Sequence, residues 1–220
     1  MNSNQLRPLI LDIGSHTFRL GFAGDDAPLI TTPSIYCDIT DYLFNSKVIE
    51  GLEEIFFGHD ENIQKYLFGE DALKYQEILK VHEFKKEGNI RLLSNFFTHY
   101  YNQLDIAPEN RNKQSIIILS PFFMPDVEKH KLRQMFFELN FPSLIFVPET
   151  KAILSTLQKS SGVILNIGES NTFISTVFHG FSNIMARDTF PIAGKELTDY
   201  YLNLIVSGKG AGKELYLDAW

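Results

Sequence analysis

Hydrophobic residues recur along this chain with two periods, one typical of strands and one typical of helices. Near the start, the apolar residues 9–11 lead into Asp12, the small pair Gly14-Ser15 follows, and residues 18–22 alternate between apolar and other side chains. Apolar segments on either side of small turn residues predict a strand, a tight turn and a returning strand. The start of the chain is therefore expected to form a β-hairpin.

The rest of the chain is predicted to alternate between strands and helices. Val127, Met135, Phe136 and Leu139 are expected to be the inward-facing residues of a helix over residues 125–140. Strands interleaved with helices predict an α/β fold, and the early hairpin makes its sheet mixed. Helices are expected over residues 89–104, 125–140, 150–158 and about 195–205, and strands over residues 115–120, 143–147, 163–167 and 172–178.

Composition limits the domain size, the binding partners and the cellular location that are expected of the protein. A chain of 220 residues, 44% of them hydrophobic, can bury the core of one or two domains. A net charge of −7 without a long basic run argues against direct nucleic-acid binding. Cys37 is the single cysteine, and no signal peptide or membrane-spanning segment is visible. We therefore expect an intracellular protein, cytoplasmic or nuclear, without a membrane partner.

The turn of the first hairpin carries residue types that suit phosphate. A glycine followed by a hydroxyl residue, as in Gly14-Ser15, lets backbone N–H groups approach an anion closely. Asp12, at the strand end, is placed to hold a water on a phosphate-bound Mg²⁺, and Arg19 can lie against phosphate oxygens. An ordinary β-hairpin shows the same alternation, so the residue types leave both interpretations open.

A second loop repeats the pattern of the first. The string LNIG at residues 165–168 echoes LDIG at residues 11–14. Gly168, Glu169 and Ser170 thus form a second candidate phosphate loop. A plain hairpin turn at Gly168 is the alternative.

Several literal strings of the sequence point to one known family. The string GFAGDDAP at residues 21–28 is followed by PSI at residues 33–35, and further strings are FGEDA at 68–72, YNQL at 101–104, IAPE at 106–109 and AGKELTDY at 193–200. With these strings, the sequence resembles the actin and actin-related protein family from about residue 9 to residue 205, and the first of them resembles the opening of actin.

This resemblance implies an actin-like, ribonuclease-H-like fold with a mixed five-stranded sheet flanked by helices and an incomplete second lobe. Residues 1–33 and 84–156 would form the first subdomain, and residues 34–83 an enlarged second one. Residues 157–194 would begin a third subdomain, and residues 195–220 would begin a fourth and add a tail.

The resemblance also implies a nucleotide site, because actin-like ATPases grip nucleotide phosphates between two facing hairpins. ATP or ADP with Mg²⁺ would lie between the two loops, with Asp12 holding Mg²⁺ through water and Gly194 forming a wall of the adenine pocket. The implied nucleotide-binding residues are Asp12, Gly14, Ser15, His16, Arg19, Gly168, Glu169, Ser170 and Gly194.

Positions near the implied γ-phosphate site depart from actin. Asn166 replaces an aspartate and lacks the charge that helps to order Mg²⁺ and its waters. Glu149 replaces the glutamine that positions the attacking water, although a carboxylate can still act as a base. His16 replaces a glycine, either as a phosphate donor or as a plain surface histidine, and Phe173 replaces a histidine. These changes predict weak or absent hydrolysis.

Two further departures lie outside the loops. Residues 36–67 are longer than in actin and carry Leu52, Ile55, Phe56 and Phe57, either as a packed amphipathic helix or as a partner-binding surface. Residues 208–213 superficially resemble a P-loop, but their spacing is too short and no Ser or Thr follows. A flexible or extended tail is expected there instead.

Three functions are compatible with these features. The first, which we favour, is a non-catalytic actin-related subunit of a larger cytoskeletal or chromatin-associated assembly, bound to other protein subunits or to actin-like chains. The second is an ATP-hydrolysing filament subunit. The third is a metabolic kinase or chaperone ATPase of the wider superfamily, which lacks support because no sugar- or peptide-binding signature is visible.

Overall fold

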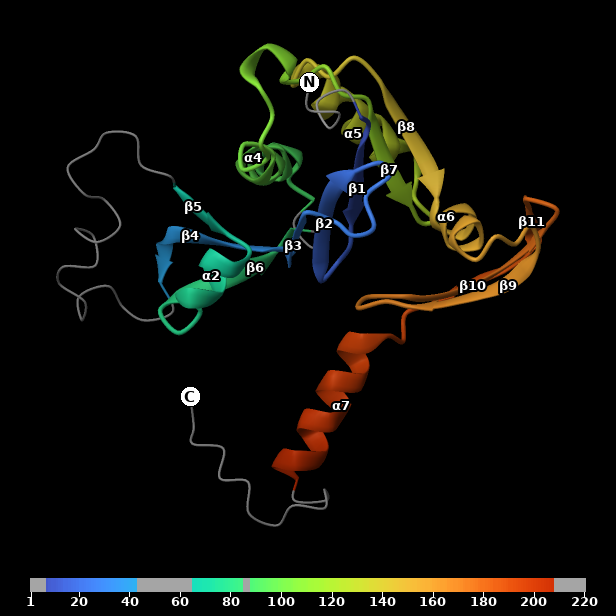
Figure 1. The fold of residues 1–220 in the computed structure, drawn as a ribbon. Helices are drawn as coiled ribbons and strands as arrows, with labels where there is room; N and C mark the ends of the chain where they lie inside the picture. The colour runs from blue at the N-terminus through green and yellow to red at the C-terminus, as the bar shows by residue number, and fades with distance from the viewer. Residues whose placement is uncertain (1–6, 43–64, 85–87, 208–220) are drawn as a thin grey trace. The chain divides into compact units, whose positions relative to one another are not determined.

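The structure is a computed structural model that describes residues 7–42, 65–84 and 88–207. It divides into two units, Met1–Val147 and Pro148–Trp220, and each unit is described by itself. Figure 1 shows the order of the elements along the chain. The segment with Leu52, Ile55, Phe56 and Phe57 and the tail from residue 208 lie outside the described residues.

A five-stranded mixed sheet forms the centre of the first unit, as the sequence predicts. Its strands are β1 (Leu9–Ile13), β2 (Thr17–Phe22), β3 (Ile30–Pro33), β7 (Ile116–Ser120) and β8 (Leu144–Pro148). They lie in the order β3-β2-β1-β7-β8 (Figure 1). Strand β1 pairs antiparallel with β2, which places Asp12 opposite Arg19, and parallel with β7. The hairpin strands therefore lie at the middle of the sheet.

Two helices of the first unit contribute to the same core as the sheet. Helix α4 (Ile90–Tyr101) begins after Asn89, whose side-chain oxygen accepts hydrogen bonds from the backbone N–H groups of Arg91 and Leu92, each at 3.2 Å. This cap satisfies donors that the first turn of a helix leaves free. Helix α5 (Asp126–Glu138) follows β7, and a short 3₁₀ turn, η3 (Pro108–Asn110), lies between α4 and β7.

One residue expected in the core of α5 lies in solvent instead. Val127 is 68% exposed, because it lies in the first turn of α5 at the rim of a cavity. Met135 and Phe136 are buried as predicted, and Leu139 packs against the core while partly exposed. Leu132 occupies the further buried position of the helix. The prediction for Val127 was therefore wrong.

Aromatic rings from the sheet and both helices meet in the core of the first unit. Phe18 of β2 meets Phe96 of α4 edge-on with ring centroids 5.1 Å apart, and Phe97 meets Phe136 of α5 at 4.9 Å. Such edge-to-face pairs contribute roughly 0.5–1.5 kcal/mol beyond the burial of their area. These ring contacts join the β1–β2 hairpin to α4 and join α4 to α5.

A smaller sheet completes the described part of the first unit. It consists of β4 (Ile35–Tyr42), β5 (Tyr66–Phe68) and β6 (Leu79–Glu83) in the order β5-β4-β6, with helix α2 (Glu70–Lys74) between β5 and β6. Cys37 is buried here, and burial raises the pKa of its thiol to about 11. The thiol is therefore protonated at neutral pH.

The described part of the second unit contains one helix, a three-stranded antiparallel sheet and a second helix. These are α6 (Glu149–Thr156), β9 (Gly162–Ile167), β10 (Thr172–Phe178), β11 (Phe181–Phe190) and α7 (Gly194–Val206), with the strands in the order β11-β10-β9. Strand β10 has the predicted bounds and turns at His179 and Gly180, both with positive φ. The hydrophobic pattern did not predict β11.

The fold requires glycine at position 69. Gly69 has φ of +54°, and a Cβ there would collide with the hydroxyls of Thr32 and Tyr100, which hydrogen-bond to each other at 2.9 Å. We expect Gly69→Ala to lower the free energy of unfolding by about 2 kcal/mol or more, because strain and overpacking act together. Urea denaturation followed by circular dichroism measures the loss.

Gly88→Ala is the matched control for this substitution. Gly88 also has positive φ, +60°, but nothing lies within 4 Å of the Cβ position. Gly88→Ala should lower the free energy of unfolding by only about 1 kcal/mol, the cost of backbone strain alone. Equal losses for the two variants would show that crowding at Gly69 is not the cause.

Candidate phosphate loops

The first candidate loop is closed by a backbone hydrogen bond from its glycine. The N–H of Gly14 donates to the carbonyl oxygen of Thr17 at 3.0 Å. A Cβ on Gly14 would lie 2.5 Å from that oxygen, so only glycine fits. The turn itself therefore explains Gly14, and a phosphate-binding function is not needed to account for it.

The structure brings together the predicted residues Asp12 and Arg19. They lie opposite each other on β1 and β2, and Arg19 Nη1 contacts Asp12 Oδ2 at 2.8 Å. An ion pair exposed to this extent contributes little to stability. It does orient the Asp12 carboxylate at the strand end through Oδ2.

Ser15 and His16 form the tip of the first loop. The His16 side chain is exposed, and its backbone carbonyl accepts a hydrogen bond from the N–H of Ser34 at 2.8 Å. Ser15 is partly exposed. Both side chains are therefore accessible from solvent, and a ligand at the loop can contact them.

The second candidate loop has the same closure as the first. The N–H of Gly168 donates to the carbonyl oxygen of Asn171 at 3.0 Å, three residues further on, as Gly14 does to Thr17. A Cβ on Gly168 would lie 3.1 Å from that oxygen. The repeated sequence LDIG and LNIG thus corresponds to a repeated backbone turn.

The second loop is joined to the start of α7. The N–H of Gly194 donates to the Gly168 carbonyl at 2.9 Å, and the N–H of Lys195 donates to the Glu169 carbonyl at 3.0 Å. A Cβ on Gly194 would lie 2.9 Å from Glu169 Oε2. Gly168, Glu169 and Gly194, predicted separately, therefore lie together. The sequence indicated no such contact between the loop and the helix.

The two residues predicted to act in hydrolysis are hydrogen-bonded to each other. Asn166 Nδ2 donates to Glu149 Oε2 at 3.1 Å. Asn166 lies near the end of β9 opposite Phe173 of β10, and Glu149 is the first residue of α6. The arrangement therefore holds Glu149 in one orientation as an acceptor.

Thr150, which follows Glu149 in the sequence, is a candidate site residue that the sequence analysis did not predict. Its side chain is buried, and within the described residues its hydroxyl has no hydrogen-bond partner. Threonines are common at the start of helices, so nothing in the sequence distinguished it. The residue that follows Glu149 thus carries a buried polar group without a partner in the described part of the chain.

Comparison with known proteins places these loops in a family. The family model described as Actin matches residues 3–213, nearly the whole chain. The chain belongs to the actin family. Centractin of Schizosaccharomyces pombe is 27% identical over 201 residues, which cover 88% of this chain and 48% of centractin. This actin-family chain thus spans about half the length of the curated relative it matches.

The family match confirms the resemblance and the mixed α/β fold predicted from the sequence. Both candidate loops and the start of α7 lie within the matched residues. Among the described helices, none is both long and apolar enough to cross a membrane. The division into subdomains and the nucleotide-binding residues stay predictions.

Proposed function

We propose that this chain acts as an actin-related structural or interaction subunit of a larger cytoskeletal or chromatin-associated assembly, in the cytoplasm or the nucleus. Its partners would be other protein subunits or actin-like chains. Adenine nucleotide with Mg²⁺ would bind with its phosphates between the two loops. Hydrolysis would be weak or absent.

The observation that carries the subunit proposal is the exposed apolar surface of the second unit. Val163, Leu165 and Ile167, on one face of β9, are 60–68% exposed. Ile174 lies opposite Leu165 on β10 and extends the same face. Contiguous exposed apolar patches mark interaction sites in soluble proteins. Further protein, rather than water, is the favourable neighbour for this face.

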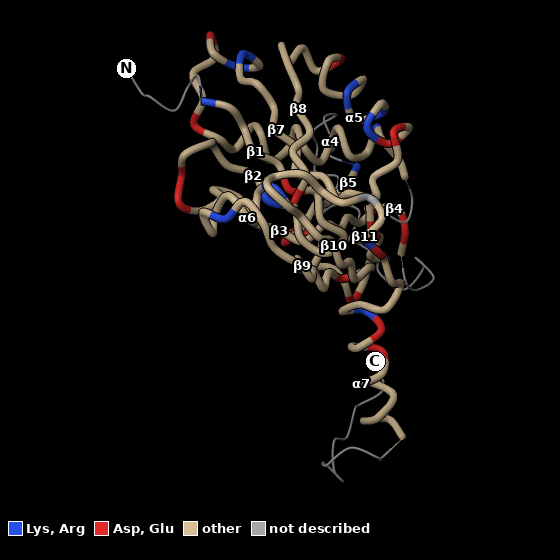
Figure 2. The backbone as a smooth tube through the Cα atoms, turned by 90° about the vertical axis from the view of Figure 1, so that its right-hand side faces the viewer, with Lys and Arg blue, Asp and Glu red and all other residues tan. Residues whose placement is uncertain are grey.

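Helix α7 supports the same proposal. Figure 2 shows its charged residues confined to the first half of the helix. The large side chains Leu197, Tyr200, Tyr201, Leu202 and Val206 are all exposed. Tyrosine and leucine side chains of this kind bury large areas when a partner covers them.

The hydrogen bond between Asn166 and Glu149 supports weak hydrolysis. Relative to actin, the amide and the carboxylate have exchanged positions, so no carboxylate at position 166 orders Mg²⁺ and its waters. Losing one preorganised electrostatic group costs on the order of 100- to 1,000-fold in phosphoryl-transfer rate. An ATP-hydrolysing filament subunit is the second candidate function, favoured by the matching turns of the two loops.

The apolar face should make the purified chain self-associate. We expect sedimentation velocity to show concentration-dependent oligomers, because exposed strands and apolar faces pair with one another. Replacing Val163, Leu165 and Ile167 together by Thr should shift the chain toward monomer. Ile145→Thr, at an exposed position of β8 in the first unit, is the control and should change nothing. A monodisperse wild-type monomer would overturn the subunit proposal.

Restoring the actin residue types at positions 149 and 166 should raise the rate of ATP hydrolysis. The double variant E149Q/N166D keeps an amide–carboxylate hydrogen bond but moves the charge to β9. We expect its phosphate release in MgATP to exceed wild type by about 100-fold, the order expected for one such group.

The single variant N166D is the control for this exchange. It should gain far less, because adjacent carboxylates at positions 149 and 166 repel each other and one of them holds a proton. If the wild-type chain hydrolyses ATP as fast as the double variant, the assignment of Asn166 is wrong.

A further inference from the structure

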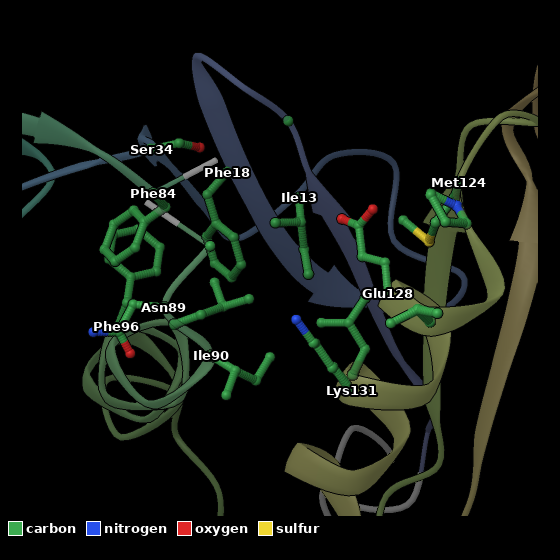
Figure 3. A pocket seen from close by; sticks show the side chains of 16 residues that line it. Ile13, Phe18, Ser34, Phe84, Asn89, Ile90, Phe96, Met124, Glu128 and Lys131 are labelled. Carbon is green, nitrogen blue, oxygen red and sulfur yellow. The ribbon is translucent and has the colours of Figure 1, made fainter. Parts of the chain in front are cut away.

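An apolar cavity of about 370 Å³ lies in the first unit. Ile13 and Phe18 of the hairpin, Leu93 and Phe96 of α4, and Leu132 of α5 line it (Figure 3). Small-molecule sites are typically concave, mostly apolar and roughly 300–1,000 Å³ in volume. The cavity has the size and lining of such a site.

A polar groove between α4 and α5 adjoins this cavity. Ile90 and Lys131 line both, and Arg91 lines the groove. Within the described residues, neither Arg91 nor Lys131 forms an ion pair. Glu138 also lines the groove, where it accepts a hydrogen bond from Gln134 at 2.8 Å. Two cations that form no ion pair among the described residues thus line the groove, which the Glu138 carboxylate also lines, and Lys131 lines the cavity as well.

The charged groups that line the cavity indicate how an anionic ligand would be oriented in it. Figure 3 shows the Glu128 carboxylate directed toward the side of Ile13 and the Lys131 amino group directed into the space between Ile13 and Ile90. Glu128 disfavours an anion at the hairpin end, whereas Lys131 and Arg91 favour one at the groove end.

We propose that the cavity and the groove bind a free single-chain anionic amphiphile, such as a fatty acid. Its head lies at Arg91 and Lys131, because guanidinium and ammonium groups form strong charge-assisted hydrogen bonds with carboxylates. Its chain fills the apolar cavity. At roughly 30 Å³ for a water-sized group, the cavity holds a chain on the order of ten carbon atoms. A two-chain membrane lipid is too large for it.

Titration of the full chain with decanoate by isothermal calorimetry tests this proposal. We expect one saturable site. The variant R91Q/K131Q should lower the affinity for decanoate about tenfold or more. It should change the affinity for decanol by less than about threefold, because only the anion interacts with the two positive charges.

Two further variants distinguish binding in the cavity from binding elsewhere on the protein surface. Val127→Trp should weaken both ligands about tenfold by blocking the mouth. Because Val127 is largely exposed, this substitution spares the core, and thermal melting by circular dichroism checks the fold. Lys129→Gln is the control, since Lys129 is on α5 but pairs with Asp126 and does not line the cavity.

Several outcomes would overturn the proposal. These are absence of decanoate binding by the folded wild-type chain, decanoate binding that survives Val127→Trp, and equal affinity for decyltrimethylammonium. Co-sedimentation with anionic vesicles that R91Q/K131Q abolishes, without saturable decanoate binding, would assign the cations to a membrane surface and equally overturn it.

Discussion

A glycine N–H that donates to the carbonyl three residues further on is the constraint on which both candidate loops depend. At Gly14 this bond closes a turn too tight for a side chain, and at Gly168 it closes a turn in which a Cβ would be crowded, 3.1 Å from the acceptor oxygen. Each turn reverses the chain so that the residue two positions before the glycine faces the residue five positions after it. Asp12 therefore lies opposite Arg19, and Asn166 opposite Phe173.

The two loops share this backbone but differ in charge. In the first, a carboxylate at the strand end is paired with a cation. In the second, the strand end carries an amide that donates to Glu149 on a neighbouring helix. Equivalent positions thus hold an oriented anion in one loop and a neutral donor in the other. This asymmetry is the physical basis for proposing nucleotide binding without efficient hydrolysis.

Much of the fold was predictable because its periodic segments are long and regular. Strand β10 alternates cleanly and has the predicted bounds, and α7 begins and ends within a residue of its predicted range. Strand β11 was missed because Arg187 and Asp188 interrupt its apolar pattern. Val127 was misplaced because periodicity does not distinguish a core residue from one at the rim of a cavity.

The candidate site was predictable only in part. The resemblance to actin located the loop residues, but it did not predict that Asn166 donates to Glu149, because a strand and a helix meet there through packing. The amphiphile cavity gave no sequence signal, since its walls come from segments as distant as Ile13, Leu93 and Leu132. Such sites arise from tertiary packing rather than from a local motif.

Amide hydrogen exchange with and without MgATP tests most directly the central claim that the two loops together hold nucleotide phosphates. The account predicts that MgATP slows exchange at residues 14–17 and at residues 168–171 in the same titration, with the same midpoint. Protection of one loop alone, or of neither at saturating MgATP, would contradict it.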